Sequence, residues 1–365
     1  TLQLQENKHL YNRKEGQKPE NRPKNRYKNI LPFDHTRIVL RDGDPTVPGS
    51  DYINANLVTV LPSMEELSGL QKKYISSQGC LMNTVDDFWR MIWQENCRII
   101  VMTTKEIERG KQKCSQYWPD PGQRQKYAGK LVVEQESEES TSDYTLRKFS
   151  LNQENFPASQ ARRVFQWHFL AWPDHGCPTD PGTVLNFLEQ LNQCLENDCP
   201  PDVGPTVVHC SAGIGRTGTF IVTDLILNQI KRVGYHCPID IPKTVQMVRE
   251  QRSGMVQTEQ QYRFLYQAVM YYVDSVRKHL EFGNRMPPGH EYTNIKYTTE
   301  GAGGQLTPTT PTPLAGSPQD YQSTNNSAPY CQSPPVGGQA PPTFHLDPPP
   351  LPKRPPRQQN ASSAS

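Results

Sequence analysis

The sequence lacks a hydrophobic run long enough to cross a membrane. A spanning helix needs about 20 predominantly apolar residues, and the most apolar stretch, Thr219 to Ile230, is interrupted by Asp224 and Asn228. Residues 2–13 also lack the apolar core of a secretory signal peptide. The chain begins with Thr rather than Met, so we expect further sequence to precede it.

An excess of charge of one sign is also missing. Lys and Arg number 39, Asp and Glu number 37, and the formal net charge is +2. This near-balance argues against a nucleic-acid binder and against a polybasic membrane protein. We therefore expect no nucleic-acid partner and no direct insertion into a membrane.

Cysteines at disulfide or metal-binding spacing are missing as well. The nine cysteines are an odd number without paired spacing, which is a poor match to a secreted disulfide framework. No C-x-x-C occurs, and the closest pair, Cys194 and Cys199, has no His in register for zinc. We therefore predict no bound metal or other cofactor, and free thiols in a reducing cytoplasm.

Composition divides the chain near residue 283. Seventeen of the 34 prolines fall in residues 282–365, where aliphatic residues nearly vanish. Such a segment cannot bury enough apolar surface to offset chain entropy, so residues 283–365 are predicted to be a disordered Pro/Ser/Thr-rich tail. Residues 23–282 have the length of one large domain, and residues 1–22 are expected to be a linker or helix.

Between these ends, strand and helix signals are mingled. Runs rich in β-branched residues predict strands at residues 98–103, 131–133, 163–168 and 206–209. Apolar residues at helical spacing predict helices at residues 84–94, 181–195, 217–232, 243–251 and 258–280. Asn83 and Asp180–Pro181 are expected to open the first two helices. This mixture predicts an α/β domain around a mixed, twisted sheet.

The strongest motif is His209-Cys-Ser-Ala-Gly-Ile-Gly-Arg216-Thr-Gly218. A strand, a glycine-bearing loop and a helix in this order aim backbone N–H groups at a phosphate. The same field stabilises a thiolate, so the pKa of Cys210 should lie well below about 8.5. Arg216 can grip two phosphate oxygens, and Thr217 could hydrogen-bond the departing sulfur. A buried structural Cys in an ordinary turn is the alternative.

This segment resembles the signature loop of the phosphotyrosine-specific protein tyrosine phosphatases, and further motifs of that family follow in the expected order. They are Lys24-Asn-Arg-Tyr27, Asp51-Tyr-Ile-Asn-Ala55, Glu108 through Pro119, Trp172-Pro-Asp174 and Val256-Gln-Thr258. Across residues 23–282 the resemblance implies the cysteine-phosphatase fold, with a highly twisted mixed sheet flanked by helices. It also implies metal-free hydrolysis of phosphotyrosine in proteins through a phosphocysteine intermediate.

The resemblance assigns a role to each matching residue. Cys210 is the nucleophile, Arg216 holds the phosphate, and Asp174 protonates the leaving phenolate, a step worth about 10²–10⁴ in rate. Gln257 orients the attacking water, with Gln261 one helical turn further on the same face. The substrate-binding residues are expected to be Tyr27, Ser211, Ala212, Gly213, Ile214, Gly215, Asp174, Gln257 and Gln261. The supporting residues are expected to be His209, Thr217, Glu108, Lys113 and Trp172.

Each assignment has a structural alternative that the residues alone leave open. Asp174 could be an ordinary turn residue, and Gln257 a solvated side chain near a helix start. Glu108, expected to pair with Arg216, would look the same in a surface ion pair, and Tyr27 could be a core aromatic. Many relatives have Asp where Asn29 follows the tyrosine, so the preference for peptide sequence stays open.

Further segments resemble the non-receptor branch that carries two N-terminal Src-homology-2 domains. These segments are Arg13-Lys-Glu-Gly16, Lys24 through Asp34 and Met255 through Glu259. The resemblance implies that such domains precede this chain and that the first of them blocks the active site. It also makes Cys80 and Cys114 candidate redox partners of the nucleophile, with buried structural thiols as the alternative.

The tail carries candidate docking motifs. Glu291-Tyr-Thr-Asn-Ile295 resembles a site for adaptor Src-homology-2 proteins once Tyr292 is phosphorylated, and three weaker candidates are Tyr297, Tyr321 and Tyr330. Pro349-Pro-Leu-Pro-Lys-Arg354 fits a polyproline ligand of Src-homology-3 domains, with a low-complexity linker as the alternative. Together these motifs predict action in intracellular tyrosine-kinase signalling.

Three rival functions agree with parts of the sequence. A catalytically dead phosphatase would only bind phosphotyrosine, but Cys210, Arg216 and Asp174 are all present. A dual-specificity phosphatase would have a shallow pocket, against which the Tyr27 loop argues. A scaffold whose tail matters most is compatible with enzymatic activity.

Overall fold

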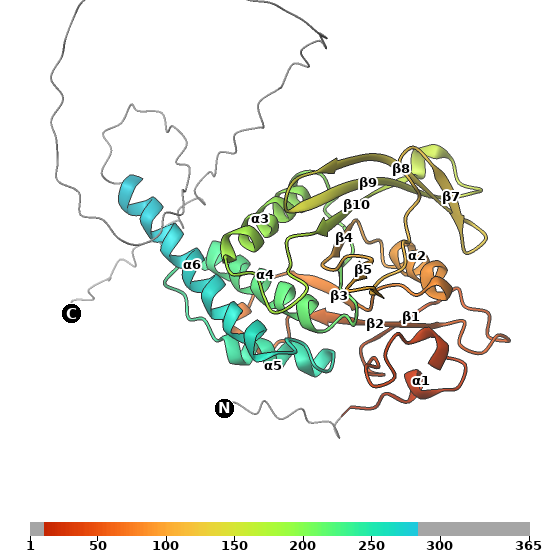
Figure 1. Ribbon diagram of the computed structural model, residues 1–365, viewed down its shortest axis with the longest axis horizontal. Coiled ribbons are helices and arrows are strands. Elements are labelled where there is room, and N and C mark those ends of the chain that lie inside the picture. Colours follow the sequence, from red (N-terminus) through yellow and green to blue (C-terminus); the bar gives the residue numbers. More distant parts are fainter. Residues whose placement is uncertain (1–10, 284–365) are drawn as a thin grey trace, which may run out of the picture. The chain divides into compact units, whose positions relative to one another are not determined.

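The chain folds around one large mixed β-sheet with helices on both faces, as predicted (Figure 1). The structure, a computed structural model, describes residues 11–283, with side chains described as far as residue 280. Apart from Gly283, which ends the last helix, the predicted tail lies outside the described residues.

Nine strands make up the sheet: β1 (Arg37–Val39), β2 (Tyr52–Thr59), β3 (Lys73–Ser77), β4 (Ile99–Met102), β7 (Arg124–Tyr127), β8 (Leu131–Ser140), β9 (Tyr144–Gln153), β10 (Arg162–Phe169) and β11 (Thr206–His209). Their order is β1-β2-β3-β11-β4-β10-β9-β8-β7. The four central strands, β3, β11, β4 and β10, are parallel neighbours, and the outer pairs are antiparallel. Strands β4 and β11 are buried on both faces, as is typical of central parallel strands.

In residues 11–283, six α-helices accompany the sheet: α1 (Lys14–Gln17), α2 (Val85–Gln94), α3 (Pro181–Asn197), α4 (Gly215–Val233), α5 (Ile241–Gln251) and α6 (Glu259–Gly283). Four short 3₁₀ turns are η1 (Arg22–Lys24), η2 (Glu65–Leu67), η3 (Met82–Thr84) and η4 (Ala158–Gln160). A small separate hairpin pairs β5 (Ile107–Glu108) with β6 (Lys111–Gln112). Its turn residues, Arg109 and Gly110, both have positive φ, the geometry of a two-residue hairpin turn.

The two faces of the sheet carry separate hydrophobic cores. Helices α3, α4, α5 and α6 cover one face, and alternate strand residues such as Ile99 and Val101 point into that core (Figure 1). Their neighbours Ile100 and Met102 point to the other face, where α2 packs. This alternation follows from the two-residue period of a strand.

The predicted strands and helices are confirmed in place, with one cap different. Asp180 accepts a hydrogen bond from the Gly182 N–H at 2.9 Å and Pro181 opens α3, as expected. The expected cap by Asn83 is wrong, because η3 leads directly into α2 and places Asn83 inside a helical turn. Its side chain instead donates to the Pro23 carbonyl at 3.2 Å.

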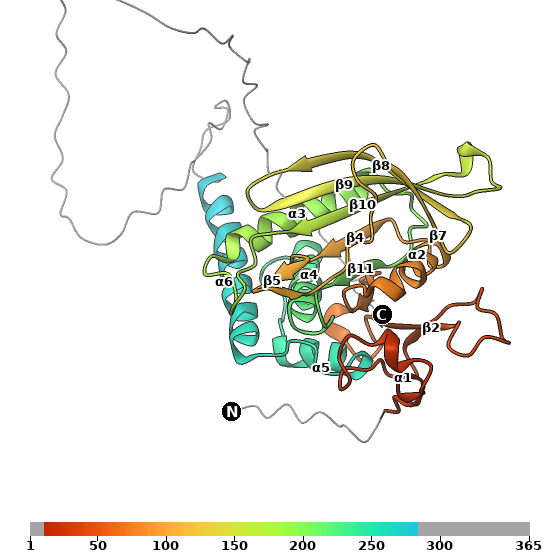
Figure 2. The same cartoon turned by 45° about the vertical axis from the view of Figure 1, so that its right-hand side comes forward.

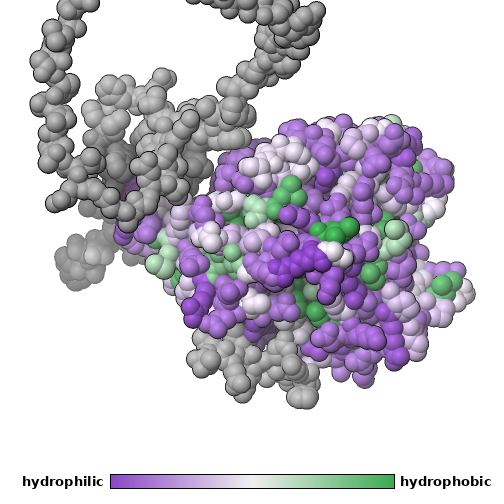
Figure 3. Space-filling view, in the orientation of Figure 1, coloured by the Kyte–Doolittle hydropathy of each residue, from purple (hydrophilic) through white to green (hydrophobic). Residues whose placement is uncertain are grey.

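The face of the described part that Figure 3 shows is mainly hydrophilic, with apolar groups in small separate patches. None of the helices in residues 11–283 is both long and apolar enough to cross a bilayer.

Candidate active site

The predicted nucleophile, Cys210, directly follows β11 in the middle of the sheet, where the chain turns into α4 (Figure 2). Its side chain is 6% exposed, and the Gly213 N–H donates to its Sγ at 3.2 Å. Burial alone would raise the pKa of this thiol. Hydrogen bonds from Thr217, the Arg216 charge and the Gly213 amide outweigh burial, so the pKa of the thiol is lowered. The buried Thr217 Oγ1 has no other partner among the described residues, so it is available to the sulfur.

A buried arginine that the sequence did not reveal binds backbone carbonyls of the loop after β11. Arg252 donates from Nη2 to the Ala212 carbonyl at 3.1 Å and from Nε to the Gly213 carbonyl at 2.9 Å. In a trans peptide the C=O and N–H point in opposite directions. These bonds therefore turn the N–H groups that follow toward the Cys210 side. Gly213 has φ +70°, and a Cβ there would lie 2.1 Å from a carbonyl oxygen of β3, so only glycine fits.

Arg216 is held by a bidentate pair with Glu108, as predicted. Its Nη1 donates to Glu108 Oε1 at 2.6 Å and its Nη2 to Oε2 at 3.1 Å. The same two nitrogens donate to the carbonyls of Thr103 and Pro173 at 2.9 and 3.3 Å. Burial would raise the pKa of Glu108, but the bonds from Arg216 and the Thr104 hydroxyl lower it, so the carboxylate is charged.

His209 lies behind the nucleophile as a neutral side chain. Burial lowers its pKa to about 3. Its Nε2 lies 2.8 Å from the Tyr117 hydroxyl, which itself accepts from Gln166 Nε2 at 2.7 Å. Tyr117 therefore donates to Nε2, and the Nδ1–H donates to the Cys210 carbonyl at 3.3 Å. Both ring nitrogens are occupied, which suits a supporting role better than that of a base.

The loop between β10 and α3 presents Asp174 to solvent. Trp172 anchors the loop, since it is 3% exposed and its Nε1 donates to the Gly176 carbonyl at 3.1 Å. The Arg216 guanidinium lies 5.9 Å from the Trp172 ring and also binds the Pro173 carbonyl. The Asp174 carboxylate has no hydrogen-bond or ion-pair partner within the described part of the chain, and it follows directly on a segment fixed to the catalytic arginine.

Tyr27 and two glutamines are the remaining predicted substrate-binding residues beside the loop after β11. The Tyr27 hydroxyl lies 2.9 Å from Ser211 Oγ. The expected helical relation between Gln257 and Gln261 differs in the structure, because α6 begins only at Glu259. Gln261 turns back instead, and its Oε1 accepts from the Gln257 N–H at 2.9 Å. Both side chains still reach the loop, since a Cβ at Gly215 would lie 2.9 Å from Gln261 Nε2 and 3.2 Å from Gln257 Oε1.

Val256, beside Gln257, is a second residue that the sequence did not reveal. It has φ +58°, which is strained for a β-branched residue. Its N–H donates to the Ile214 carbonyl at 3.0 Å, and its own carbonyl accepts from Arg249 Nη2 at 2.7 Å. This backbone conformation at Val256 sets the direction in which the chain continues to Gln257. A single valine carries no sequence signal for such a conformation.

The remaining predicted residues have more ordinary surroundings. Lys113 is half-buried, and its backbone N–H donates to the Glu106 carbonyl at 2.7 Å. Cys80 and Cys114 are buried free thiols, and burial, followed by the interaction with Cys114, raises the pKa of Cys80. The tail motifs lie outside the described residues; they are Tyr292, Tyr297, Tyr321, Tyr330 and Pro349 to Arg354.

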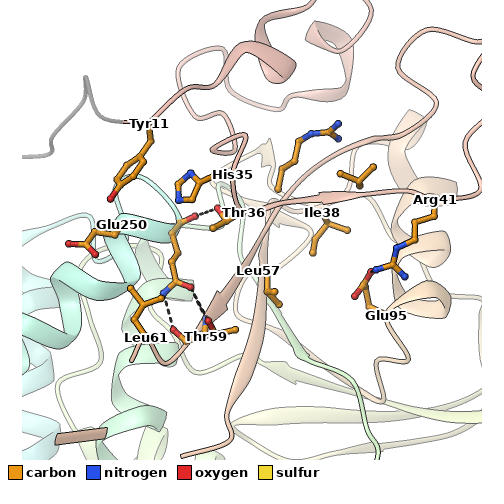
Figure 4. Close-up of a pocket in the computed structure, with 13 residues that line it drawn as sticks. Tyr11, His35, Thr36, Ile38, Arg41, Leu57, Thr59, Leu61, Glu95 and Glu250 are labelled. Carbon is orange, nitrogen blue, oxygen red and sulfur yellow. Dashed lines mark hydrogen bonds and ion pairs between the residues drawn. The ribbon is translucent and has the colours of Figure 1, made fainter. Parts of the chain in front are cut away.

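A groove of about 690 Å³ lies elsewhere, beside β1 and the end of α5 (Figure 4). Tyr11, His35 and Glu250 border it, and the Gln251 side chain bonds Thr59 across it. None of the predicted site residues lines it. The predicted site is instead identified by the Cys210 loop and by Arg216 with its partner Glu108.

Comparison with known proteins agrees with this geometry. A family model described as protein-tyrosine phosphatase matches residues 21–271. Tyrosine-protein phosphatase corkscrew of Drosophila melanogaster is 38% identical over 84% of this chain and 53% of its own length. The Drosophila virilis protein of the same name is 56% identical over 66% of this chain and 31% of its own length. Tyrosine-protein phosphatase non-receptor type ptp-2 of Caenorhabditis elegans is 43% identical over 72% and 45%.

The chain spans about half or less of the length of these relatives. The family match nevertheless covers the sheet, the Cys210 loop and every predicted site residue outside the tail. This chain belongs to the protein-tyrosine phosphatase family.

Proposed function

We propose that this chain hydrolyses phosphotyrosine in proteins through a phosphocysteine intermediate on Cys210. The observation that carries the proposal is the bidentate pair between Arg216 and Glu108 beside a thiol of lowered pKa. This arrangement offers a nucleophile, a fixed guanidinium and backbone amides to one phosphate group.

The proposed reaction has two displacements at phosphorus. The Cys210 thiolate attacks phosphorus while the bond from phosphorus to the tyrosine oxygen breaks and Asp174 gives that oxygen a proton. Water placed by Gln257 then attacks the phosphocysteine and passes a proton to Asp174, and phosphate leaves. Thr217 stabilises the departing thiolate. Arg216 and the loop amides bind the equatorial oxygens in both steps.

Selectivity for phosphotyrosine is proposed to come from the depth of the site. Cys210 is buried, and the half-buried Tyr27 stands beside the loop with its hydroxyl 2.9 Å from Ser211. A short phosphoserine side chain would not carry its phosphate past that ring to the sulfur, whereas an aryl phosphate would.

We further propose the organisation that the sequence predicts. Residues 23–282 form the catalytic domain, residues 1–22 a linker or helix, and residues 283–365 a signalling tail. Src-homology-2 domains upstream, adaptor proteins at phosphorylated Tyr292 and Src-homology-3 proteins at residues 349–354 are proposed partners. Action in cytoplasmic tyrosine-kinase signalling follows from these partners.

Loss of Tyr292 tests the proposed adaptor site. It should abolish adaptor pull-down by the phosphorylated chain, and unchanged pull-down would contradict this site.

Hydrolysis of a phosphotyrosine peptide, with a chelator present, tests the activity. Wild-type protein should turn over, Cys210→Ser should be inactive, and Asp174→Ala should be slowed at least about 100-fold. A phosphoserine version of the same peptide should not be cleaved. Folded wild-type protein that binds the peptide without turnover would instead support a pure phosphotyrosine-binding module.

A further inference from the structure

An arginine on β9, Arg147, stands at the start of two hydrogen-bond paths that lead to the catalytic residues. It lies opposite Gln166 of β10, and His168 follows two residues further on the same face of that strand. The Arg147 Nη1 donates to Gln166 Oε1 at 3.0 Å and to His168 Nδ1 at 3.3 Å. The side chain is 11% exposed, and an ion pair from its Nε to Glu138 at 2.6 Å holds it in place.

The first path runs through His168 to Arg216. Because an arginine only donates, His168 accepts at Nδ1 and carries its proton on Nε2, which donates to the Thr104 carbonyl at 2.8 Å. In a trans peptide the C=O and the following N–H point in opposite directions. The bond to Thr104 therefore turns the Lys105 N–H toward Glu108, whose Oε1 lies 3.3 Å away. The same carboxylate binds both terminal nitrogens of Arg216.

The second path runs through Gln166 to Cys210. The guanidinium occupies Gln166 Oε1, so the Nε2 of this amide faces the Tyr117 hydroxyl and donates to it at 2.7 Å. That hydroxyl then donates to His209 Nε2, 2.8 Å away. The single proton of the neutral His209 ring is therefore on Nδ1, which donates to the Cys210 carbonyl at 3.3 Å. Each donor on this path is set by the one before it, and the first donor is the arginine.

The links of both paths are buried. Gln166 and His209 are 0% exposed, Tyr117 is 1% exposed and His168 is 3% exposed. Burial lowers the pKa of His168, and the Arg147 charge adds to this against the bond to Thr104, so the ring is neutral. A lost donor at such depth leaves its acceptor unsatisfied, because water does not reach it. The orientation of each buried link therefore depends on the guanidinium at the start.

We propose that Arg147 is a positioning residue of the active site, which orients Arg216 through His168 and the Cys210 peptide through Gln166. This inference rests on the phosphatase activity proposed above. The residues that face the phosphate are Cys210 and Arg216, whereas Arg147 acts on them through intervening side chains. A misplacement of about 1 Å in a catalytic group costs up to about 100-fold in rate.

Steady-state kinetics of Arg147→Met with a phosphotyrosine peptide tests the proposal. Met has a similar length and lacks every donor, so kcat should fall at least about 10-fold with a smaller change in KM, measured below the unfolding transition. The matched control is Lys148→Met, which breaks the adjacent ion pair on β9, from Lys148 to Glu139 at 2.9 Å, and should keep the wild-type kcat. A kcat of Arg147→Met that equals the wild type, or that falls no further than in the control, would overturn the proposal.

Two further variants interrupt one path each, and they also test the proposal where Arg147→Met folds poorly. Gln166→Leu should slow alkylation of Cys210 by iodoacetamide at about pH 6 several-fold, since the nucleophile is the thiolate. His168→Leu should weaken, several-fold, the protection of Cys210 from alkylation by inorganic phosphate, which Arg216 binds. If neither variant differs from the wild type in its own measurement, the two paths do not position the site.

Alkylation and phosphate protection need no turnover, so they separate this inference from the proposed function. Wild-type protein that does not hydrolyse the peptide would refute the phosphatase activity. The altered alkylation of Gln166→Leu and the altered protection of His168→Leu would still establish that Arg147 positions the two groups.

Discussion

Replacement of Arg252 by Met should strongly affect both the stability and the activity of the domain. Arg252 is 1% exposed, and burial lowers its pKa to about 10, so it is charged at neutral pH. Its guanidinium donates to Asn54 Oδ1 at 2.9 Å, to Asn56 Oδ1 at 2.8 Å, and to the carbonyls of Ala212 and Gly213. Met has a similar length but leaves these four acceptors buried without that donor.

The size of the effect follows from those four bonds. One orphaned buried acceptor costs about 1–3 kcal/mol, and loss of one partner from a buried charged network costs about 3–5 kcal/mol. Such losses are not additive, because Ser76 Oγ still donates to the Gly213 carbonyl at 2.8 Å. We therefore expect Arg252→Met to lower the free energy of unfolding by about 3–5 kcal/mol.

Urea unfolding followed by tryptophan fluorescence measures this change. The matched control is Arg263→Met, since Arg263 has a side chain 74% exposed and, among the described residues, pairs only with Glu259 on the surface of α6. The control should change stability by no more than about 0.5 kcal/mol. The variant Arg252→Met, assayed below its unfolding transition, should also lose at least about 10-fold in kcat. If both variants unfold alike and Arg252→Met keeps full kcat, the loop carbonyls do not depend on this arginine.

Three further changes test other parts of the site. Glu108→Gln removes the charge that fixes Arg216, so steady-state kinetics should show kcat about 10–100-fold lower with a smaller change in KM, and an unchanged kcat would refute this role. The His209 pKa, about 3 in the fold and about 6.5 when unfolded, makes stability rise with pH across that window. Between pH 7 and pH 5 its burial should therefore remove about 2 kcal/mol from the free energy of unfolding. Urea unfolding of His209→Asn should lack this loss, and a pH profile parallel to the wild type would contradict it. Tyr27→Phe removes only the hydroxyl at Ser211 and should change kcat/KM for phosphotyrosine peptides less than about 3-fold. Tyr27→Ala removes the ring as well and should lower kcat/KM more than about 10-fold. Equal effects of the two changes would show that the ring is not the selective element.

The elements that the sequence predicted are those with a strong apolar pattern. Strands β4 and β11 read as buried runs, and α2 through α6 have apolar residues at helical spacing. The sequence analysis did not predict β3 or β9, and it predicted only the first three residues of β8. Alternate residues of β9 are half-exposed, and three of them, Lys148, Ser150 and Asn152, are polar, so the strand lacks the composition of a buried run.

The candidate site likewise contains residues that the sequence identified and residues that it did not. The loop motif indicated Cys210 and Arg216, the family resemblance indicated Glu108, and the structure joins all three. The contributions of Arg252 and Val256 depend on contacts between segments about 40 residues apart and on one unusual φ angle. Such tertiary features leave no periodic or local signal in a single sequence.

The most direct test of the proposed mechanism is to trap the covalent intermediate. The variant Gln257→Ala should slow the second displacement. It is mixed with a phosphotyrosine peptide labelled with phosphorus-32 and quenched rapidly without acid. Up to one label per chain should then be found on the peptide that contains Cys210. Label on any other residue, or none at all while dephosphorylated peptide is released in a burst, would contradict a phosphocysteine at Cys210.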